Sequence, residues 1–101
     1  MTEAWEVLLI AFKNYLSKHG KRILSILDII GQEYVKTEVK SLFPYHNPSI
    51  GYIKLMDAVQ EVINDREQIE KLRKRGIEII LEEGEYYLRS YKDAIRKLIG
   101  K

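Results

Sequence analysis

The segment from Ile77 to Arg89 constrains the fold of this chain more than any other part of its sequence. Glu83 and Gly84 suit a two-residue turn, because glycine readily adopts the positive φ that such turns require. Pairing the chain about this turn sets apolar residues opposite apolar ones and brings opposite charges together. The pairs on one face are Leu81–Tyr86 and Ile79–Leu88, and those on the other face are Ile80–Tyr87 and Glu78–Arg89. The pattern therefore predicts a β-hairpin.

The apolar face of this hairpin must be covered, because two strands alone are marginally stable in water. Apolar residues recur at helical spacing through most of the remaining chain, so helices supply the cover. The predicted helices span Glu3–Lys18, Arg22–Ile30, Glu38–Phe43, Ile50–Lys74 and Tyr91–Ile99. Residues 50–74 form either one helix or two helices broken near Asn64. Asp65 and Gln68 fit a capping box for a second helix, whereas the apolar phase of the first continues to Leu72.

The boundaries of these helices follow from capping and breaking residues. The expected N-caps are Thr2, Thr37 and Ser90, and the residues expected to end helices are Gly20, Gly31, Pro44 and Gly76. Tyr34 and Val35, which lie between two predicted helices, are expected to form a short extended piece.

The length of 101 residues suits one domain, which is expected to comprise the N-terminal helix in residues 1–20 and a second part in residues 21–101. The chain has no cysteine, which excludes disulfides, thiolate zinc sites and a cysteine nucleophile. Its longest apolar run, Val7–Phe12, is too short to cross a bilayer. Glu3 and Glu6 stand where an export signal would be basic, so a cytoplasmic protein without membrane contact is expected.

The order of these elements, and the residues where the fourth helical region meets the hairpin, resemble the winged helix-turn-helix superfamily. There a Leu four residues before a Gly is followed by an Ile-rich strand, a tight turn and a strand with Tyr and Leu. The matching residues here are Leu72, Gly76, Ile77, Ile79, Gly84, Tyr86 and Leu88. The following segment SYKDAIRKLIG is similar to the short helix that trails the wing. The resemblance implies a mainly α protein with one β-hairpin, a winged-helix-like α+β domain with an extra N-terminal helix.

The resemblance also implies binding of double-stranded DNA, which requires Lys and Arg for the phosphates. The candidate residues are Arg66, Lys71, Arg73, Lys74 and Arg75 before the hairpin, Lys21 and Arg22 near the first turn, and Arg89, Lys92 and Arg96 near the C-terminus. If these groups converge in space, they form a phosphate-binding surface. Lys97, in the C-terminal group, could join it. The other interpretation is an ordinary solvated surface, because 17 basic residues against 15 acidic ones give a net charge of only +2.

The predicted turn carries an objection to DNA binding. Glu82, Glu83 and Glu85 crowd it, and their carboxylates would repel a phosphate backbone. An alternative function is therefore a non-enzymatic accessory subunit of a replication or transcription assembly, which docks a basic partner protein through this acidic hairpin. Tyr87, on the outer face of the hairpin, would join that interface if nothing covers it.

The first predicted helix carries an apolar stripe that is wider than a surface helix needs. Its residues are Trp5, Leu8, Leu9, Phe12 and Leu16. A helix of this kind either packs on two sides or forms the seam of a homodimer. With the winged-helix interpretation, a dimer would pair two DNA-binding surfaces about a two-fold axis.

Nothing in the sequence favours an enzyme, a metal, a cofactor or a small-molecule substrate. His19 and His46 are 27 residues apart and do not fit a metal-ligand spacing, and no nucleotide-binding or hydrolase motif is present. The leading hypothesis is a small DNA-binding protein, either a transcription regulator or a chromatin-associated factor. The many Ile, Lys, Arg and Glu residues and the absence of Cys are compatible with a thermophile.

Overall fold

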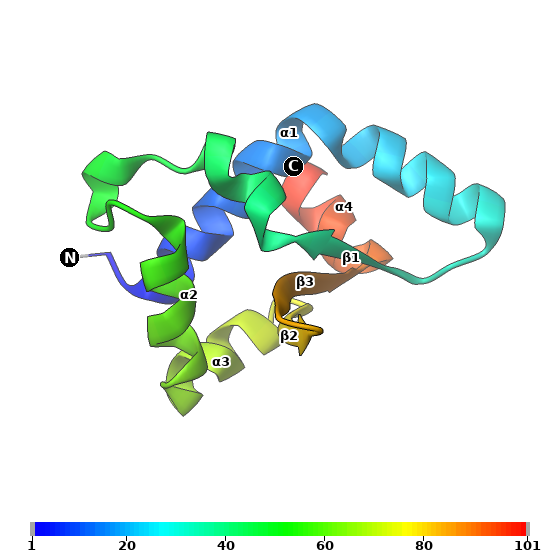
Figure 1. Ribbon diagram of the computed structural model, residues 1–101. Coiled ribbons are helices and arrows are strands. Elements are labelled where there is room, and N and C mark those ends of the chain that lie inside the picture. The colour runs from blue at the N-terminus through cyan, green and yellow to red at the C-terminus, as the bar shows by residue number, and fades with distance from the viewer. Residues whose placement is uncertain (1, 101) are drawn as a thin grey trace.

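The computed structural model describes residues 2–100, which form a mainly helical protein with one small antiparallel sheet. The elements are α1 (Ala4–Ile30), β1 (Tyr34–Glu38), the 3-10 helices η1 (Val39–Tyr45) and η2 (Pro48–Ile50), α2 (Leu55–Ile63), α3 (Arg66–Arg73), β2 (Ile77–Glu82), β3 (Glu85–Tyr91) and α4 (Lys92–Gly100). Figure 1 shows that α1 runs the length of the molecule. The helices α2 and α3 lie near the start of α1, and the last turns of α1 extend past the sheet.

The N-terminal region is one continuous helix, α1. The prediction of two separate helices over Glu3–Lys18 and Arg22–Ile30 is therefore wrong. Gly20 lies inside α1 and is fully surrounded, because α4 packs against it. A Cβ at this position would lie 2.3 Å from Cδ1 of Ile99. The glycine therefore permits close contact between two helices and ends neither of them. It also marks no boundary between a first and a second part of the chain.

The start of α1 is capped by Glu3 and not by Thr2 as predicted. The Glu3 side chain accepts from the backbone of Glu6, and the Glu6 side chain accepts from the backbone N–H of Glu3. This reciprocal capping box satisfies backbone donors that a helix start leaves free.

The hairpin is confirmed, including its register: Leu81 pairs with Tyr86, Ile79 with Leu88, Ile80 with Tyr87 and Glu78 with Arg89. The turn residues Glu83 and Gly84 have φ values of 48° and 80°, as a type I′ turn requires. The extended piece at Tyr34 is a third strand, β1, which pairs with β3 and gives the strand order β1-β3-β2.

The segment after β1 differs in detail from its prediction. The helix expected over Glu38–Phe43 is the 3-10 helix η1, and Thr37 lies in β1 and caps nothing. Pro44 lies within η1 and does not end it as predicted, and Phe43 is exposed.

The break near Asn64 is real, and residues 55–73 form two helices. The Asp65 side chain caps α3 by accepting from the backbone N–H of Glu67. Gln68 does not complete a capping box. Its Nε2 donates to the Asp65 carboxylate and its Oε1 accepts from the backbone N–H of Trp5, which joins α3 to the start of α1.

The core is built around α1, which contacts α2, α3, α4 and η1. The stripe predicted as a dimer seam belongs to this core: Leu8 and Phe12 are fully buried, Trp5 is nearly so, and Leu9 packs against the same cluster. The two-sided packing explains the width of the stripe, so these residues are not available to a second copy. Within residues 2–100, no helix is long and apolar enough to span a membrane.

Candidate nucleic-acid interface

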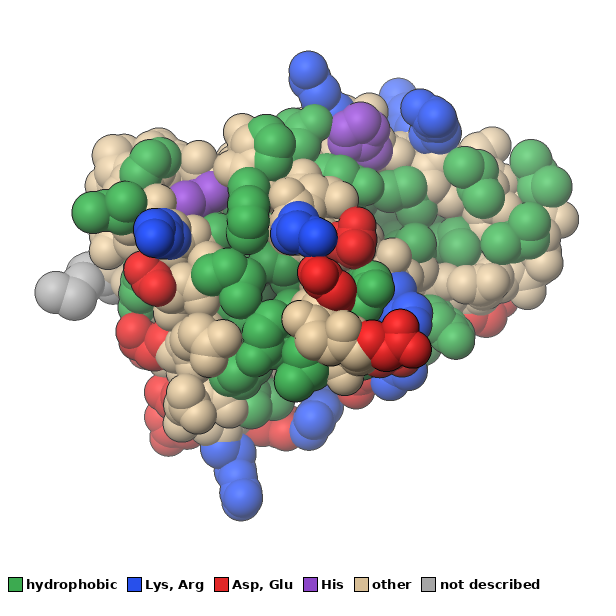
Figure 2. All heavy atoms as spheres, viewed as in Figure 1, with side chains coloured by type: hydrophobic (Ala, Val, Ile, Leu, Met, Phe, Trp, Pro, Cys, Tyr) green, Lys and Arg blue, Asp and Glu red, His purple; other side chains and the backbone are tan. Residues whose placement is uncertain are grey.

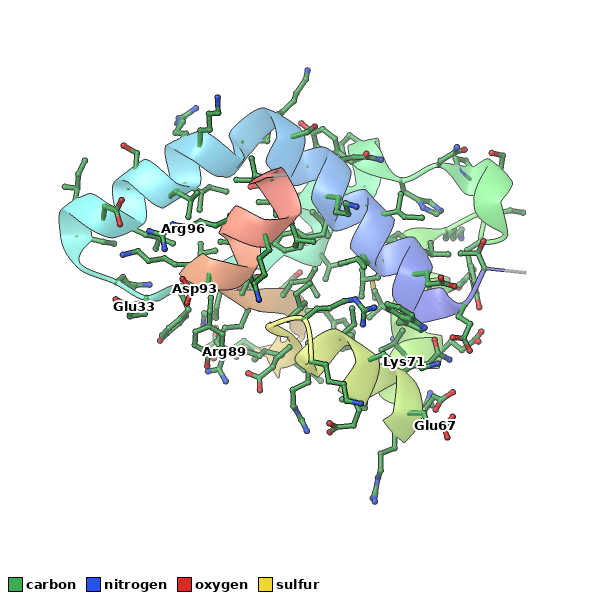
Figure 3. The ribbon with its side chains drawn as sticks, turned by 180° about the vertical axis from the view of Figure 1, so that it is seen from behind. Glu33, Glu67, Lys71, Arg89, Asp93 and Arg96 are labelled. Carbon is green, nitrogen blue, oxygen red and sulfur yellow. The ribbon has the colours of Figure 1, made fainter. Side chains whose placement is uncertain are left out.

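A basic groove of about 540 Å³ lies where α1, the end of α3 and α4 meet, on the side of the molecule shown in Figure 3. Its charged lining residues are Lys13, Arg73, Lys74, Arg75, Lys97 and Asp93. Five cations therefore face one carboxylate, although they come from three separate parts of the chain. Tyr91, Leu9 and Leu98 add apolar surface to the same groove.

Three of these cations are free to meet a ligand. Lys13, Lys74 and Lys97 are exposed, and among the described residues they form no ion pair. The one acid, Asp93, is held by Arg96, whose Nη1 lies 3.1 Å from its Oδ1. The groove thus presents ammonium groups whose charge is not neutralised by the protein itself.

Arg75 is positioned in the groove by Trp5. Its guanidinium lies over the indole ring, 4.5 Å from the ring centroid, and its Nη1 donates to the backbone oxygen of Lys71 at 2.9 Å. The indole is fixed in turn, because its Nε1 donates to the Glu3 carboxylate at 2.7 Å. A cation held over an aromatic ring loses little freedom on binding a phosphate, and a planar guanidinium can bind it with two hydrogen bonds.

Glu3 joins this arrangement to α3. The Nζ of Lys71 donates to its Oε1 at 3.0 Å. Hydrogen bonds from Trp5 and then from Lys71 hold the pKa of the Glu3 carboxyl below its ordinary value. The same contact, led by the hydrogen bond to Glu3, raises the pKa of Lys71. Lys71, predicted to bind DNA, is therefore engaged with the start of α1.

Four of the other nine predicted DNA-binding residues also have acidic partners. Arg73 pairs with Glu70 and Glu78, Arg89 pairs with Glu78, Lys92 lies 2.7 Å from Asp28, and Arg96 pairs with Asp93. These pairs tie β3 to β2 and α4 to the end of α1. Figure 3 shows Arg96 and Lys71 far apart on this side of the molecule, so the predicted groups do not form one surface.

Of the remaining predicted residues, Lys74 and Arg75 line the groove. Arg66, Lys21 and Arg22 are exposed, have no ion-pair partner in residues 2–100, and do not line it. Arg66 lies at the start of α3, whereas Lys21 and Arg22 lie in the middle of α1.

Lys13 is the groove residue that the sequence did not reveal. It stands among Leu9, Leu16 and Gly20 at helical spacing, on the side of α1 that meets α4. A lysine at helical spacing with apolar residues indicates that a positive charge lies next to the surface on which the helix packs. The stripe alone does not say which helix packs there, so it could not place Lys13 beside Lys97.

The acidic hairpin tip is remote from the groove and partly neutralised. Lys36 pairs with Glu82, and Lys40 lies 3.4 Å from Glu85. The groove adjoins the base of the hairpin at Gly76, and six residues of strand separate that base from the tip by about 17 Å. On the face shown in Figure 2, acidic and basic side chains lie close together over the middle of the molecule.

The outer face of the sheet is open and carries a network of aromatic and charged side chains. Tyr87 is half-buried, with Nζ of Lys36 5.1 Å from its ring centroid. Arg89 lies over Tyr34, whose ring meets Tyr91 edge-on. Tyr87, the tyrosine predicted at an interface, thus packs against Lys36 of its own sheet and stays partly exposed.

The chemistry available at the groove is electrostatic. Ammonium and guanidinium groups bind anions, and the tyrosine offers a ring and a hydroxyl. Residues 2–100 contain no group of three His, Cys, Asp or Glu side chains that could hold a metal ion. Comparisons with protein-family models, with curated proteins and with solved structures found no match.

Proposed function

We propose that this protein binds double-stranded DNA through phosphate contacts in the basic groove. The convergence of Lys13, Lys74, Arg75 and Lys97 from three parts of the chain is the observation that carries this proposal. Lys and Arg side chains supply most of the affinity of proteins for DNA by displacing counterions from the phosphates.

The order of elements supports a winged-helix form of this function. A helix pair joined by a short turn, α2 and α3, precedes the β2–β3 hairpin, and α4 follows it. The hairpin tip carries acids and points away from the groove, so the wing makes no phosphate contact here. The contact surface lies at the base of the wing instead.

The exposed side of α3 favours binding without strong sequence preference. Arg66 and Arg73 stand there beside Glu67 and Glu70, so its charges balance. Reading of bases needs side chains that are free to enter the major groove, whereas phosphate contacts carry no direct sequence information. The balanced charge of α3 therefore fits a chromatin-associated factor better than a transcription regulator that reads one operator. We expect this factor to be cytoplasmic. The acidic-hairpin adaptor is less favoured, because Lys36 and Lys40 already occupy two of its carboxylates.

The test is binding of a labelled DNA duplex over a salt series. With four phosphate contacts, a plot of log association constant against log salt should have a slope of about −3.6. The variants Lys13→Gln, Lys74→Gln and Lys97→Gln should each weaken binding and reduce the slope by about 0.9, because each removes one contact.

Lys54→Gln is the matched control. Lys54 is exposed, has no ion pair within the described chain, and lies outside the groove. Its variant has the same net charge as the groove variants and should keep the wild-type slope. Equal losses in all four variants, or no binding at low salt, would contradict the proposal.

A further inference from the structure

The strand β2 lies at an edge of the sheet, and part of its backbone has no partner. A two-residue turn makes Glu82 and Glu85 a hydrogen-bonded pair, so the next such pairs along the hairpin include Ile80 with Tyr87. The backbone groups of Ile79 and Leu81 must therefore point away from β3. No backbone bond outside the hairpin uses them within residues 2–100.

This edge is also bordered by a recess. A cavity of about 270 Å³ lies between β2 and α3. Its apolar lining residues are Ile63, Ile69, Leu72, Ile77, Ile79 and Ile80, and its charged ones are Arg73, Glu78 and Arg89. Leu81, at the open end of the edge, leaves 58% of its surface exposed. The edge thus combines free backbone groups with accessible apolar side chains.

Edge strands in monomeric proteins usually carry a lysine, a proline, a bulge or an inward charge that prevents pairing with another strand. The opposite edge, β1, carries Lys36. In contrast, β2 has the sequence IEIILE, with only apolar residues on its inner face and neither lysine nor proline. Its two charged residues, Glu78 and Glu82, lie on the outer face and leave the inner face without a protecting charge.

We propose that β2 pairs antiparallel with β2 of a second copy of this chain, so that two three-stranded sheets join across a two-fold axis. The occupant is a second copy because the strand is complementary to itself in one register. The axis of such a pair passes midway between the two copies of one β2 residue, and the outward-pointing backbone groups of both copies then meet.

Charge and apolarity select Ile79 as the residue on the axis. With the axis at Glu78, two carboxylates would face each other, and with the axis at Ile80, Glu78 would face Glu82 of the second copy. With the axis at Ile79, each Ile79 faces the other, Ile77 faces Leu81, and Glu78 faces Ile80. Apolar residues then meet on the inner face and no like charges oppose each other.

Single-cysteine variants test this register directly, because the natural chain has no cysteine. Ile79→Cys places two thiols opposite each other, within the distance that a disulfide spans. Leu81→Cys places them about 13 Å apart along the strands, which is too far. With diamide as oxidant, Ile79→Cys should form at least ten times more covalent dimer than Leu81→Cys. Leu81 is the more exposed residue, so random collision predicts the opposite order.

Light scattering over a concentration series tests the association of two copies without a crosslinking reaction. The wild type should approach twice the mass of one chain, whereas Leu81→Lys, which adds a charge at the edge, should keep the mass of one chain with an unchanged circular dichroism spectrum. A wild-type mass of one chain at every concentration would overturn the proposal, as would equal or greater crosslinking of Leu81→Cys. These measurements use no DNA, so their failure leaves the proposed groove untouched.

Discussion

The close contact between α1 and α4 depends on the absence of a side chain at Gly20. Alanine is favoured over glycine inside a helix by about 1 kcal/mol, so a glycine in the middle of a 27-residue helix has a local cost. Here that cost is offset by close packing, because the side chain of Ile99 occupies the space that a Cβ would need. The substitution of this glycine therefore has two opposing effects, and they can be separated.

We expect Gly20→Ala to stabilise the protein by about 1 kcal/mol only when Ile99 is also replaced by alanine. In the wild-type background the new Cβ must displace Ile99, so the gain should be smaller or reversed. Urea unfolding of the wild type, both single variants and the double variant measures the coupling. An equal gain in both backgrounds would show that Ile99 does not restrict this position.

At the scale of elements, α1 has two parts with different surroundings. Its first half is enclosed by the core, whereas its last turns extend past the sheet and expose Ile26, Ile29 and Ile30. Figure 2 shows hydrophobic side chains gathered over this end of the molecule. Leu27 is the inward anchor of these turns, and Lys92 of α4 pairs with Asp28 beside it.

Two isolated substitutions test this anchoring. Leu27 is 3% exposed, so Leu27→Ala should lower the free energy of unfolding by about 2–5 kcal/mol, as for other buried leucines. Ile29 is 81% exposed, and Ile29→Ala should change it by less than about 0.5 kcal/mol. Denaturant unfolding gives both values. Similar losses in the two variants would mean that Ile29 is covered in solution.

At the scale of the whole molecule, ion pairs connect segments that are distant in sequence. Glu3 joins the N-terminus to α3, and Asp28 joins the end of α1 to α4. The pKa of each carboxyl lies below its ordinary value, for Asp28 chiefly because Lys92 donates a hydrogen bond to it. A carboxyl whose pKa is lowered by folding stabilises the protein above its ordinary pKa and loses that effect as the pH falls through the folded value.

We therefore expect the stability of the wild type to fall as the pH drops below about 4.5, the ordinary pKa of the Glu3 side chain. Glu3→Gln should be slightly less stable than the wild type at neutral pH, and the two should converge in acid. Glu67→Gln is the control, because Glu67 lies on the outer side of α3 without an ion pair in the described chain (Figure 3). A pH-independent difference for Glu3→Gln would contradict this origin of the acid sensitivity.

The candidate site was only partly accessible to sequence reasoning. Lys74 and Arg75 belong to an evident basic segment, and the structure places both in the groove. Other predicted cations, such as Arg89 and Lys92, have acidic partners that lie far away in the sequence or on another strand. Whether a lysine is free or paired depends on those partners, and residue type does not reveal them.

The sequence by itself determined the hairpin and its register, because a turn and its cross-strand pairs depend on neighbouring residues. It left open whether residues 50–74 form one helix or two, and the structure has two, α2 and α3. Only the tertiary structure decided that α1 is continuous through Gly20, that Trp5 and Phe12 belong to the core, and that Lys13 and Lys97 share a groove. Each of these depends on how α4 and α3 pack against α1. Packing brings together side chains that are tens of residues apart in the sequence, and a local sequence pattern does not show which of them will be in contact.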